Sequence, residues 1–363
     1  MSSKRRQPHG SNPALPALSF TIKLRAIPFL KTMKYFIFTL GCQMNVSDSE
    51  RIATILEREG CKASDEKNAD LIIVNACSVR QKAVDRIWGK IKIWQPAGKK
   101  IVLTGCVLPS DKKKFAKKGI EYTDFHNDNF FDIIPHFTPA CRQTRSHISY
   151  IPIMTGCDNF CSYCAVPLTR GREKSRPIRN VISDIKRALE NGSKEILLLG
   201  QNVNSYKFGF GKLLKKIDNL PCDFKFNFIS SNPHDMTDEL IETFAQLKKW
   251  PRELHLPLQS GDGEVLKKMN RKYTSNQYLK LVANLKSQIS NLKITTDIIV
   301  GFPDESKEQF QNTIKLCKKM CFDKAYIAQY SPRPGTASAK LIDDVSKTEK
   351  KRRWLILENL INK

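Results

Sequence analysis

Residues 153–176 read IMTGCDNFCSYCAVPLTRGREKSR, and this stretch decides how the rest of the chain is interpreted. Cys157, Cys161 and Cys164 stand in it with a C-x3-C-x2-C spacing. Three thiolates in one short loop can hold three irons of a four-iron cluster, which leaves the fourth iron open to bind and reduce a small molecule. We expect Tyr163 to cover that side of the cluster. Three unrelated core cysteines, or a zinc site, are the alternatives, although structural zinc sites close all four positions.

This loop resembles the signature of the radical S-adenosylmethionine (SAM) enzymes, which have an aromatic residue before the third cysteine. In that superfamily the open iron binds the amino and carboxylate groups of SAM, and one electron from the cluster cleaves SAM to a 5'-deoxyadenosyl radical. The resemblance therefore implies a 4Fe-4S cluster, SAM, and an electron donor such as a flavodoxin or a ferredoxin. The cofactor carries the difficult chemistry, and the protein positions it.

The amino-acid composition indicates the kind of binding partner and the cellular compartment. The chain has 363 residues, enough for two domains, and a formal net charge of +25. Such a basic chain favours a polyanionic partner, nucleic acid before membrane, although a lysine-rich proteome would also give this excess. Eleven cysteines without a secretory signal indicate a reducing compartment. No apolar run is long enough to span a bilayer, so we expect a cytoplasmic protein without a membrane partner.

Residues 1–32 are basic, contain several prolines and have no acidic residue. We expect a disordered tail, or an upstream start codon with Met33 as the effective first residue. An organellar transit peptide has a similar composition, so organellar targeting remains an alternative.

Residues 33–145 alternate strand and helix patterns, which predicts an N-terminal α/β domain with an open parallel sheet. The expected strands cover 35–40, 71–74 and 101–104. After the first strand we expect a turn at 41–45 and a helix that is capped by residues 47–50.

Cysteines follow all three expected strands: Cys42, Cys77 and Cys106. The carboxyl ends of parallel strands lie along one edge of a sheet, where ligands bind. These thiols would therefore form a second three-cysteine site, the alternative being small buried hydrophobic residues. In contrast, Cys141 in the following linker matches no cluster pattern.

Residues 146–363 contain six strand-then-helix units, which predict a partial (β/α)6 barrel with its site at the carboxyl ends of the strands. Polar segments follow these strands. Uncharged amides and hydroxyls suit the ribose, amine and adenine edge of SAM. The candidate cofactor-binding residues, besides Tyr163, are Gln201, Asn202, Gln259, Ser260 and Asp297.

Over residues 34–354 the chain resembles a narrower family, the radical-SAM methylthiotransferases. The matching motifs are GCQMN, the cysteine loop with TRGREKSRP, GQNVNSY, HLPLQSG, VLKKMNRKY, TDIIVGFP and YSPRPGTAS. They look most like the MiaB-type branch, which adds a methylthio group to C2 of isopentenyladenosine beside the tRNA anticodon. The related branches act on threonylcarbamoyl-adenosine in tRNA or on a ribosomal-protein aspartate, and an inactive RNA-binding relic is a further alternative.

The resemblance implies roles for both cysteine sets. Cys157, Cys161 and Cys164 would hold the cluster that cleaves SAM. Cys42, Cys77 and Cys106 would hold a second 4Fe-4S cluster that carries the sulfur. One SAM would supply the methyl group and another the radical. The resemblance further implies a monomer with the anticodon loop of tRNA as its partner.

Several features depart from the family or stay open. Members usually close with a small RNA-binding β-barrel, which we expect to be absent after the amphipathic stretch 352–361. Asp304 stands where the family motif GFPGE has its second glycine, a strain if the backbone there is left-handed. Arg170 and Arg172 could contact phosphate or SAM, or pair with Glu173 or other surface carboxylates.

Overall fold

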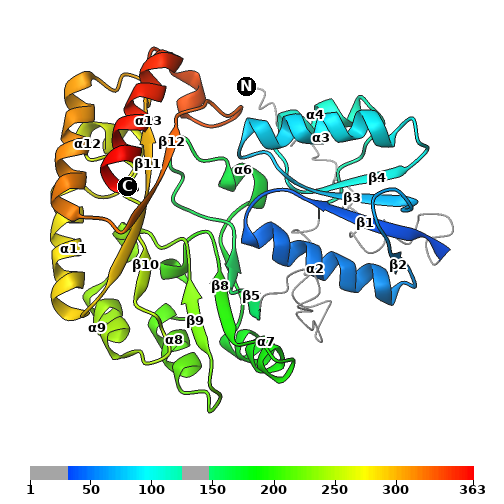
Figure 1. The fold of residues 1–363 in the computed structure, drawn as a ribbon, viewed down its shortest axis with the longest axis horizontal. Helices are drawn as coiled ribbons and strands as arrows, with labels where there is room; N and C mark the ends of the chain where they lie inside the picture. The colour runs from blue at the N-terminus through cyan, green and yellow to red at the C-terminus, as the bar shows by residue number, and fades with distance from the viewer. Residues whose placement is uncertain (1–31, 125–146) are drawn as a thin grey trace, which may run out of the picture.

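The computed structural model describes residues 32–124 and 147–363, which form two α/β bodies (Figure 1). The expected domain boundary near Arg145, the linker residue Cys141 and nearly all of the N-terminal tail lie outside the described residues. The expected fold class, an open parallel sheet followed by a partial barrel, is confirmed by the sheet order of each body.

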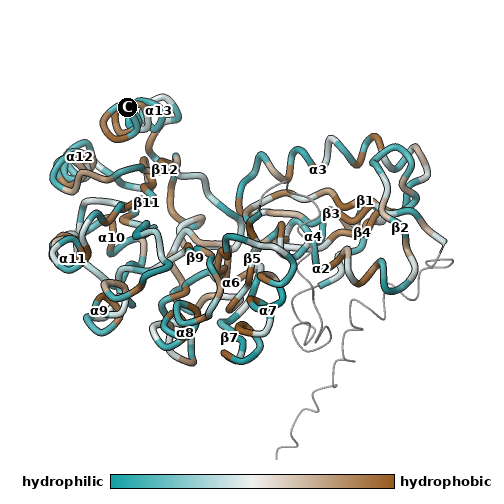
Figure 2. The backbone as a smooth tube through the Cα atoms, turned by 60° about the horizontal axis from the view of Figure 1, so that its bottom comes forward, coloured by the Kyte–Doolittle hydropathy of each residue, from teal (hydrophilic) through white to brown (hydrophobic). Residues whose placement is uncertain are grey.

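The first body is a parallel sheet with the order β2-β1-β3-β4, and helices cover it. Its strands are β1 (Lys34–Thr39), β2 (Lys62–Ala63), β3 (Leu71–Cys77) and β4 (Lys100–Cys106), and its helices are α2 (Gln43–Arg58), α3 (Gln81–Trp94) and α4 (Pro109–Ala116). The central strand β3 is apolar and buried on both faces, as parallel sheets require. Figure 2 shows the strands of this sheet mostly as hydrophobic chain.

The second body is an open barrel. Its parallel strands, in the described residues, are β5 (Ile148–Pro152), β8 (Glu195–Leu199), β9 (Lys225–Phe228), β10 (Glu253–His255), β11 (Lys293–Val300) and β12 (Lys324–Gln329). Their ladders are β5-β8-β9 and β10-β11-β12. The helices are α6 (Val166–Arg170), α7 (Ile178–Glu190), α8 (Phe210–Asp218), α9 (Asp238–Gln246), α10 (Gly263–Lys268), α11 (Ser275–Gln288), α12 (Lys307–Met320) and α13 (Lys347–Ile361). Short elements complete it: β6 (Met154–Thr155), β7 (Lys174–Ser175), η2 (Val203–Ser205), η3 (Pro233–Asp235) and η4 (Ser338–Lys340).

In strand β11, side chains alternate between the outer, helix-covered face of the barrel and its inner face. Its residues alternate between buried and half-exposed. Ile294, Ile298 and Val300 share one hydrophobic core with Phe310 and Ile314 of helix α12. The residues between them point to the opposite face, because successive side chains of a strand alternate. The inner face of the barrel therefore stays accessible, while the outer face is sealed by helices.

The start of helix α2 differs from the sequence-based expectation. The helix begins at Gln43, so most of the expected turn at 41–45 is helical and residues 47–50 do not cap it. Cys42 is the N-cap, and its backbone N–H donates to Asn45 Oδ1 at 3.4 Å. The run Ser-Asp-Ser-Glu looks like a cap because short polar residues favour helix starts. It is instead a buried polar face of the helix.

This polar face of α2 packs against strand β5 of the second body. Ser47 Oγ donates to the carbonyl of Tyr150 at 3.3 Å. Glu50 is buried nearby, and burial raises the pKa of its carboxyl to about 7, although Arg51 counteracts part of that shift. The two bodies therefore meet through polar and charged groups.

The Glu50→Gln variant tests the burial of this carboxyl. A carboxyl with a raised pKa contributes stability below its ordinary pKa of 4.5, and this contribution is lost as the pH rises through about 7. We expect Glu50→Gln to increase the free energy of unfolding by about 2 kcal/mol at pH 8 and to have little effect at pH 4.5. Chemical denaturation at both pH values measures this, with Glu190→Gln on the exposed end of α7 as control. Equal changes at both pH values would contradict the assignment.

The residue that departs from the GFPGE motif does need the left-handed conformation. Asp304 has φ +60° and lies between β11 and α12. Its Oδ2 accepts from Lys268 Nζ at 3.3 Å in an exposed ion pair. Aspartate tolerates this conformation better than most residues but less well than glycine.

Substitutions at position 304 measure that strain. We expect Asp304→Gly to be more stable than Asp304→Ala by about 1–2 kcal/mol, because only glycine adopts positive φ without steric cost. Both variants lose the exposed ion pair with Lys268, so the comparison isolates the backbone. Thermal or chemical unfolding of the two variants checks the order, and equal stabilities would refute a left-handed residue here.

Candidate functional site

The first cysteine loop follows the short strand β6 and is held by its glycine. Gly156 has φ +78°, and a Cβ there would lie 2.1 Å from the carbonyl oxygen of Arg172. The N–H of Gly156 donates to Gln201 Oε1 at 2.6 Å. Gln201 therefore ties the loop to the end of β8.

The three thiols of this loop lie close enough to influence one another. Burial, with smaller contributions from the nearby sulfurs of Cys161 and Cys157, raises the pKa of Cys164 to about 12. Each sulfur also accepts from an N–H group: Cys157 from Asn159 Nδ2 at 3.5 Å, Cys161 from Arg271 Nη1 at 3.4 Å and Cys164 from the backbone of Val166 at 3.5 Å. These N–H groups favour bound thiolates.

The second set of cysteines lies at the carboxyl edge of the first sheet. Cys77 and Cys106 are direct partners in the β3–β4 ladder, and Cys42 caps helix α2 beside them. Gly105 has φ +89°, and a Cβ there would lie 2.4 Å from Asn75 Oδ1. Only glycine fits before Cys106, as before Cys157.

Arg170 connects the two sets. It ends α6, shortly after Cys164, yet its Nε donates to Cys106 Sγ at 2.9 Å. Its Nη2 forms an ion pair with Asp48 Oδ2 at 2.8 Å, and these two side chains are 3% and 4% exposed. Burial raises the pKa of Cys106 to about 12 even though the guanidinium lowers it.

Pairing of Arg170 with Glu173 or a surface carboxylate, one of the expected alternatives, is not what the structure shows. Its guanidinium is buried against Asp48 and Cys106. Sequence could not show this, because Asp48 and Cys106 are far away along the chain. Arg172, in contrast, is exposed and pairs with Asp158 Oδ1 at 2.7 Å.

Within residues 32–124 and 147–363, no group of three or more His, Cys, Asp or Glu side chains converges on one metal position. Each thiolate of a four-iron cluster binds a different iron, so three cysteines can serve as its ligands without converging on one point.

Polar atoms without partners gather where the barrel strands end. Five of the thirteen buried side-chain atoms that lack a hydrogen-bond partner among the described residues lie in β6 or after β8, β9 and β10. They are Thr155 Oγ1, Asn202 Oδ1, Asn204 Oδ1, Ser231 Oγ and Gln259 Oε1, and the other eight lie elsewhere in the chain. Buried polar atoms are almost always satisfied, so these five can serve as contacts for a polar ligand. The residue types fit SAM, which presents hydroxyl, amine and adenine groups.

The other expected cofactor residues lie in different surroundings. Tyr163 packs against the apolar cluster of Val265, Met269, Phe302 and Tyr330 and lies near Cys161 and Cys164. Asp297 Oδ2 lies 3.2 Å from His255 Nε2 on the inner face of the barrel.

Ser260 is fully buried, with its Oγ 3.4 Å from Thr313 Oγ1 of α12. The structure therefore groups Asn202 and Gln259 with the unpartnered atoms and places Ser260 against a helix.

Two arginines of the site were not singled out by sequence. Arg271 bonds Cys161 and also donates to the hydroxyl of Tyr273 at 3.1 Å. Arg333 Nη1 donates to Gln81 Oε1 of the first body at 2.7 Å. Both stand inside motifs, NRKY and SPRPG, but the arginine alone gave no sign of its partner.

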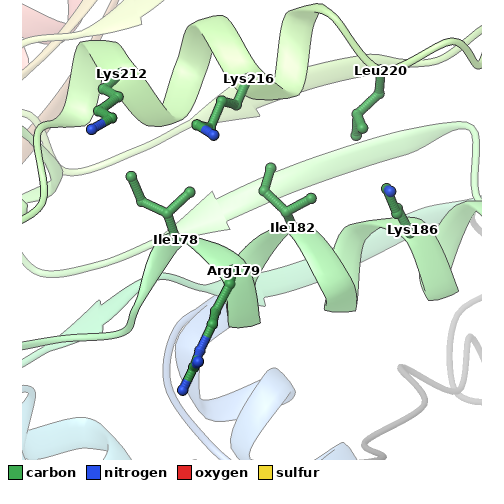
Figure 3. Close-up of a pocket in the computed structure, with 7 residues that line it drawn as sticks. All are labelled: Ile178, Arg179, Ile182, Lys186, Lys212, Lys216 and Leu220. Carbon is green, nitrogen blue, oxygen red and sulfur yellow. The ribbon is translucent and has the colours of Figure 1, made fainter.

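A separate cavity of ≈ 460 Å³ opens between α7 and α8 and contains none of these residues (Figure 3). Its lining combines three aliphatic and four cationic side chains: Ile178, Ile182, Leu220, Arg179, Lys186, Lys212 and Lys216. Its positive charge would suit a negatively charged partner, and neither cysteine set lines it.

Family models match both bodies. A model of the Radical SAM superfamily matches residues 151–317, and one described as Uncharacterized protein family UPF0004 matches residues 34–125. A protein named tRNA-2-methylthio-N(6)-dimethylallyladenosine synthase from Endomicrobium trichonymphae is 39% identical over 355 residues, covering 91% of this chain and 84% of that protein. A protein with the same name from Clostridium botulinum (strain Langeland) is 38% identical, covering 91% and 81%.

Solved structures share the fold. The radical SAM methyltransferase TsrM from Kitasatospora setae, with cobalamin and a 4Fe-4S cluster bound, has a TM-score of 0.63 at 13% identity and covers 84% of this chain and 76% of that one. The cobalamin-dependent radical enzyme OxsB has a TM-score of 0.56 at 11% identity, covering 92% and 56%. None of the helices in the described residues is long and apolar enough to cross a membrane.

The Arg170→Met variant tests the link between the two cysteine sets. It removes the Arg170 side of the buried ion pair with Asp48, so we expect a loss of about 3–5 kcal/mol in the free energy of unfolding. Adding Asp48→Asn should recover part of that loss, because the ion pair is then absent from both sides. Chemical denaturation of the single and double variants measures both values. A single variant as stable as the wild type would show that Arg170 is not in this buried pair.

Proposed function

The chain belongs to the radical SAM tRNA methylthiotransferase family, and from that membership we propose which of its residues carry the reaction. The enzyme adds a methylthio group to N6-dimethylallyladenosine, also called isopentenyladenosine, in tRNA. We assign Cys157, Cys161 and Cys164 to the cluster that activates SAM. We assign Cys42, Cys77 and Cys106 to a second cluster that holds the sulfur to be donated.

One observation supports this two-site assignment more than any other, the bond from Arg170 to Cys106. Arg170 belongs to the segment that follows the first cysteine loop, and Cys106 belongs to the second set. Their contact joins the segment that follows the first cysteine loop to the second cysteine set. A reaction that joins a sulfur from one site to a carbon activated at the other needs this proximity.

The protein's own residues prepare the two sites. Gln201 fixes the backbone of the first loop, and Arg271 donates to Cys161 Sγ. Arg170 donates to Cys106 Sγ. N–H groups on ligand sulfurs favour the charged thiolate and tune the potential of a bound cluster. When bound, the clusters and SAM supply the one-electron chemistry, the methyl group and the sulfur.

The unpartnered atoms at the rim of the barrel supply the SAM pocket in this proposal. Asn202 Oδ1 and Gln259 Oε1 accept from hydroxyl or amine groups of the ligand, and Ser231 Oγ can donate or accept. Asn202 is itself oriented, because its Nδ2 donates to Asp235 Oδ2 at 2.7 Å. Acceptors with a fixed orientation select a ligand by its donors at little cost in conformational entropy.

Iron and sulfide analysis, with product detection, tests the assignment. We compare the wild type with the triple alanine variants of Cys157, Cys161 and Cys164 and of Cys42, Cys77 and Cys106. Each variant should keep about half of the iron and show one cluster by electron paramagnetic resonance. Neither should convert an anticodon stem-loop that carries N6-dimethylallyladenosine to the methylthio product, as detected by mass spectrometry.

Other outcomes would overturn parts of the proposal. A single cluster in the wild type that disappears with the first triple variant would mean that Cys42, Cys77 and Cys106 bind no iron. A wild type that loads both clusters and modifies only a threonylcarbamoyl-adenosine stem-loop would change the substrate. A wild type with neither clusters nor product would indicate a protein that binds RNA without modifying it.

A further inference from the structure

Phe160 is an exposed aromatic residue inside the first cysteine loop. It stands beside Cys161, and 47% of its surface is exposed. Its φ is +48°, in the left-handed region that a bulky aromatic residue rarely adopts. Phe160 belongs to none of the hydrophobic clusters formed by the described residues. Burial therefore does not explain either its residue type or its strained backbone.

Neighbouring side chains hold this conformation. Asn270 Nδ2 donates to the carbonyl oxygen of Phe160 at 2.9 Å and lies 3.5 Å from that of Asn159. The Arg172 guanidinium lies over the ring, 5.2 Å from its centroid. Asp158 fixes that guanidinium through two bonds, at 2.7 and 3.2 Å. Strained residues persist where their surroundings determine them, and they cluster at functional sites.

The ring and the guanidinium, whose charge is paired with Asp158, together form an exposed surface. A planar aromatic ligand can stack on such a surface. Proteins recognise unstacked RNA bases by stacking them on aromatic rings and on arginine planes. The pair lies in the first cysteine loop, with Phe160 directly before Cys161.

We propose that Phe160 and Arg172 form a stacking platform for an unstacked RNA-loop base next to the modified adenosine. This inference rests on the proposed function and adds the group that holds the loop open beside the reacting base. A base fits better than a protein partner, because the apolar surface is one ring flanked by the charges of Arg172 and Asp158. Protein interfaces instead depend on a larger, charge-poor apolar centre.

Phe160→Leu keeps an apolar side chain and removes the aromatic face. We expect it to raise the Kd for an anticodon stem-loop with N6-dimethylallyladenosine about 5- to 150-fold, the equivalent of ~1–3 kcal/mol of stacking. Phe160→Tyr should bind within about twofold of the wild type, because its ring still stacks. Fluorescence anisotropy at one fixed salt concentration measures the series. Phe208→Leu, a matched change at an exposed ring that packs edge-on against Tyr206, should have no effect.

Removing the stacked base locates it. We replace the nucleotide on either side of the modified adenosine, in turn, with an abasic residue. At one of these positions, the abasic residue should weaken binding by the wild type by the same factor as the Phe160→Leu substitution weakens binding of the intact stem-loop. The Phe160→Leu variant should then lose nothing further, because the interaction is already absent.

Four outcomes would overturn the platform. Phe160→Leu could bind the stem-loop as tightly as the wild type does. Alternatively, the abasic residue could weaken binding by the variant by the same factor as binding by the wild type, which would make the two effects independent. Phe160→Leu could instead lose iron in proportion to affinity, which would make Phe160 a structural residue of the loop. It could also bind RNA normally and lose affinity for a reducing protein, which would make the ring a protein contact. A wild type that binds the stem-loop without forming product would count against the proposed function alone.

Discussion

The buried guanidinium of Arg170 is the interaction on which the arrangement of the two bodies depends. It lies between Asp48 and Cys106, which belong to the first body, while its own backbone belongs to the second. A buried charge is costly unless it is paired and hydrogen-bonded, so the two bodies are stable together only in the geometry that satisfies it. The same contact ties the segment after the first cysteine loop to Cys106 of the second set. The contact that holds the two bodies together therefore also fixes where Cys106 lies relative to Arg170.

The sequence was sufficient to predict an element where its local residue pattern matches the burial that the structure shows. The apolar runs of β3 and β8 and the alternation of β11 are explicit in the residues, and so is the cysteine loop. Prediction from the sequence failed where a residue contacts a partner in the other body. The polar run at 47–50 resembles a helix cap, but both bodies bury it, so the start of α2 was placed too late. Ser47 and Asp48 contact the second body, whereas Ser49 bonds Asn75 of the first sheet.

The candidate site shows the same limit at the level of single side chains. Asn202 and Gln259 could be selected because amides follow the strand ends, and both carry unpartnered buried atoms. Ser260 fits the same pattern but is buried against Thr313, since the turn directs it to helix α12. Arg271 could not be recognised, because its contact with Cys161 spans a long stretch of chain. Residue type predicts what a side chain can bind, whereas the packed chain decides which way it faces.

The order of the residues along the chain has a consequence for biosynthesis. Asp48 and Cys106 leave the ribosome before Arg170, which is their partner in the finished protein. Domains generally fold as units from the N-terminus during synthesis. The first sheet can therefore form early, but the face that carries Asp48 must stay hydrated until the segment after the cysteine loop has been translated. Arrival of the second body, rather than completion of the first sheet, then brings Arg170 onto Cys106, the buried thiol of that edge.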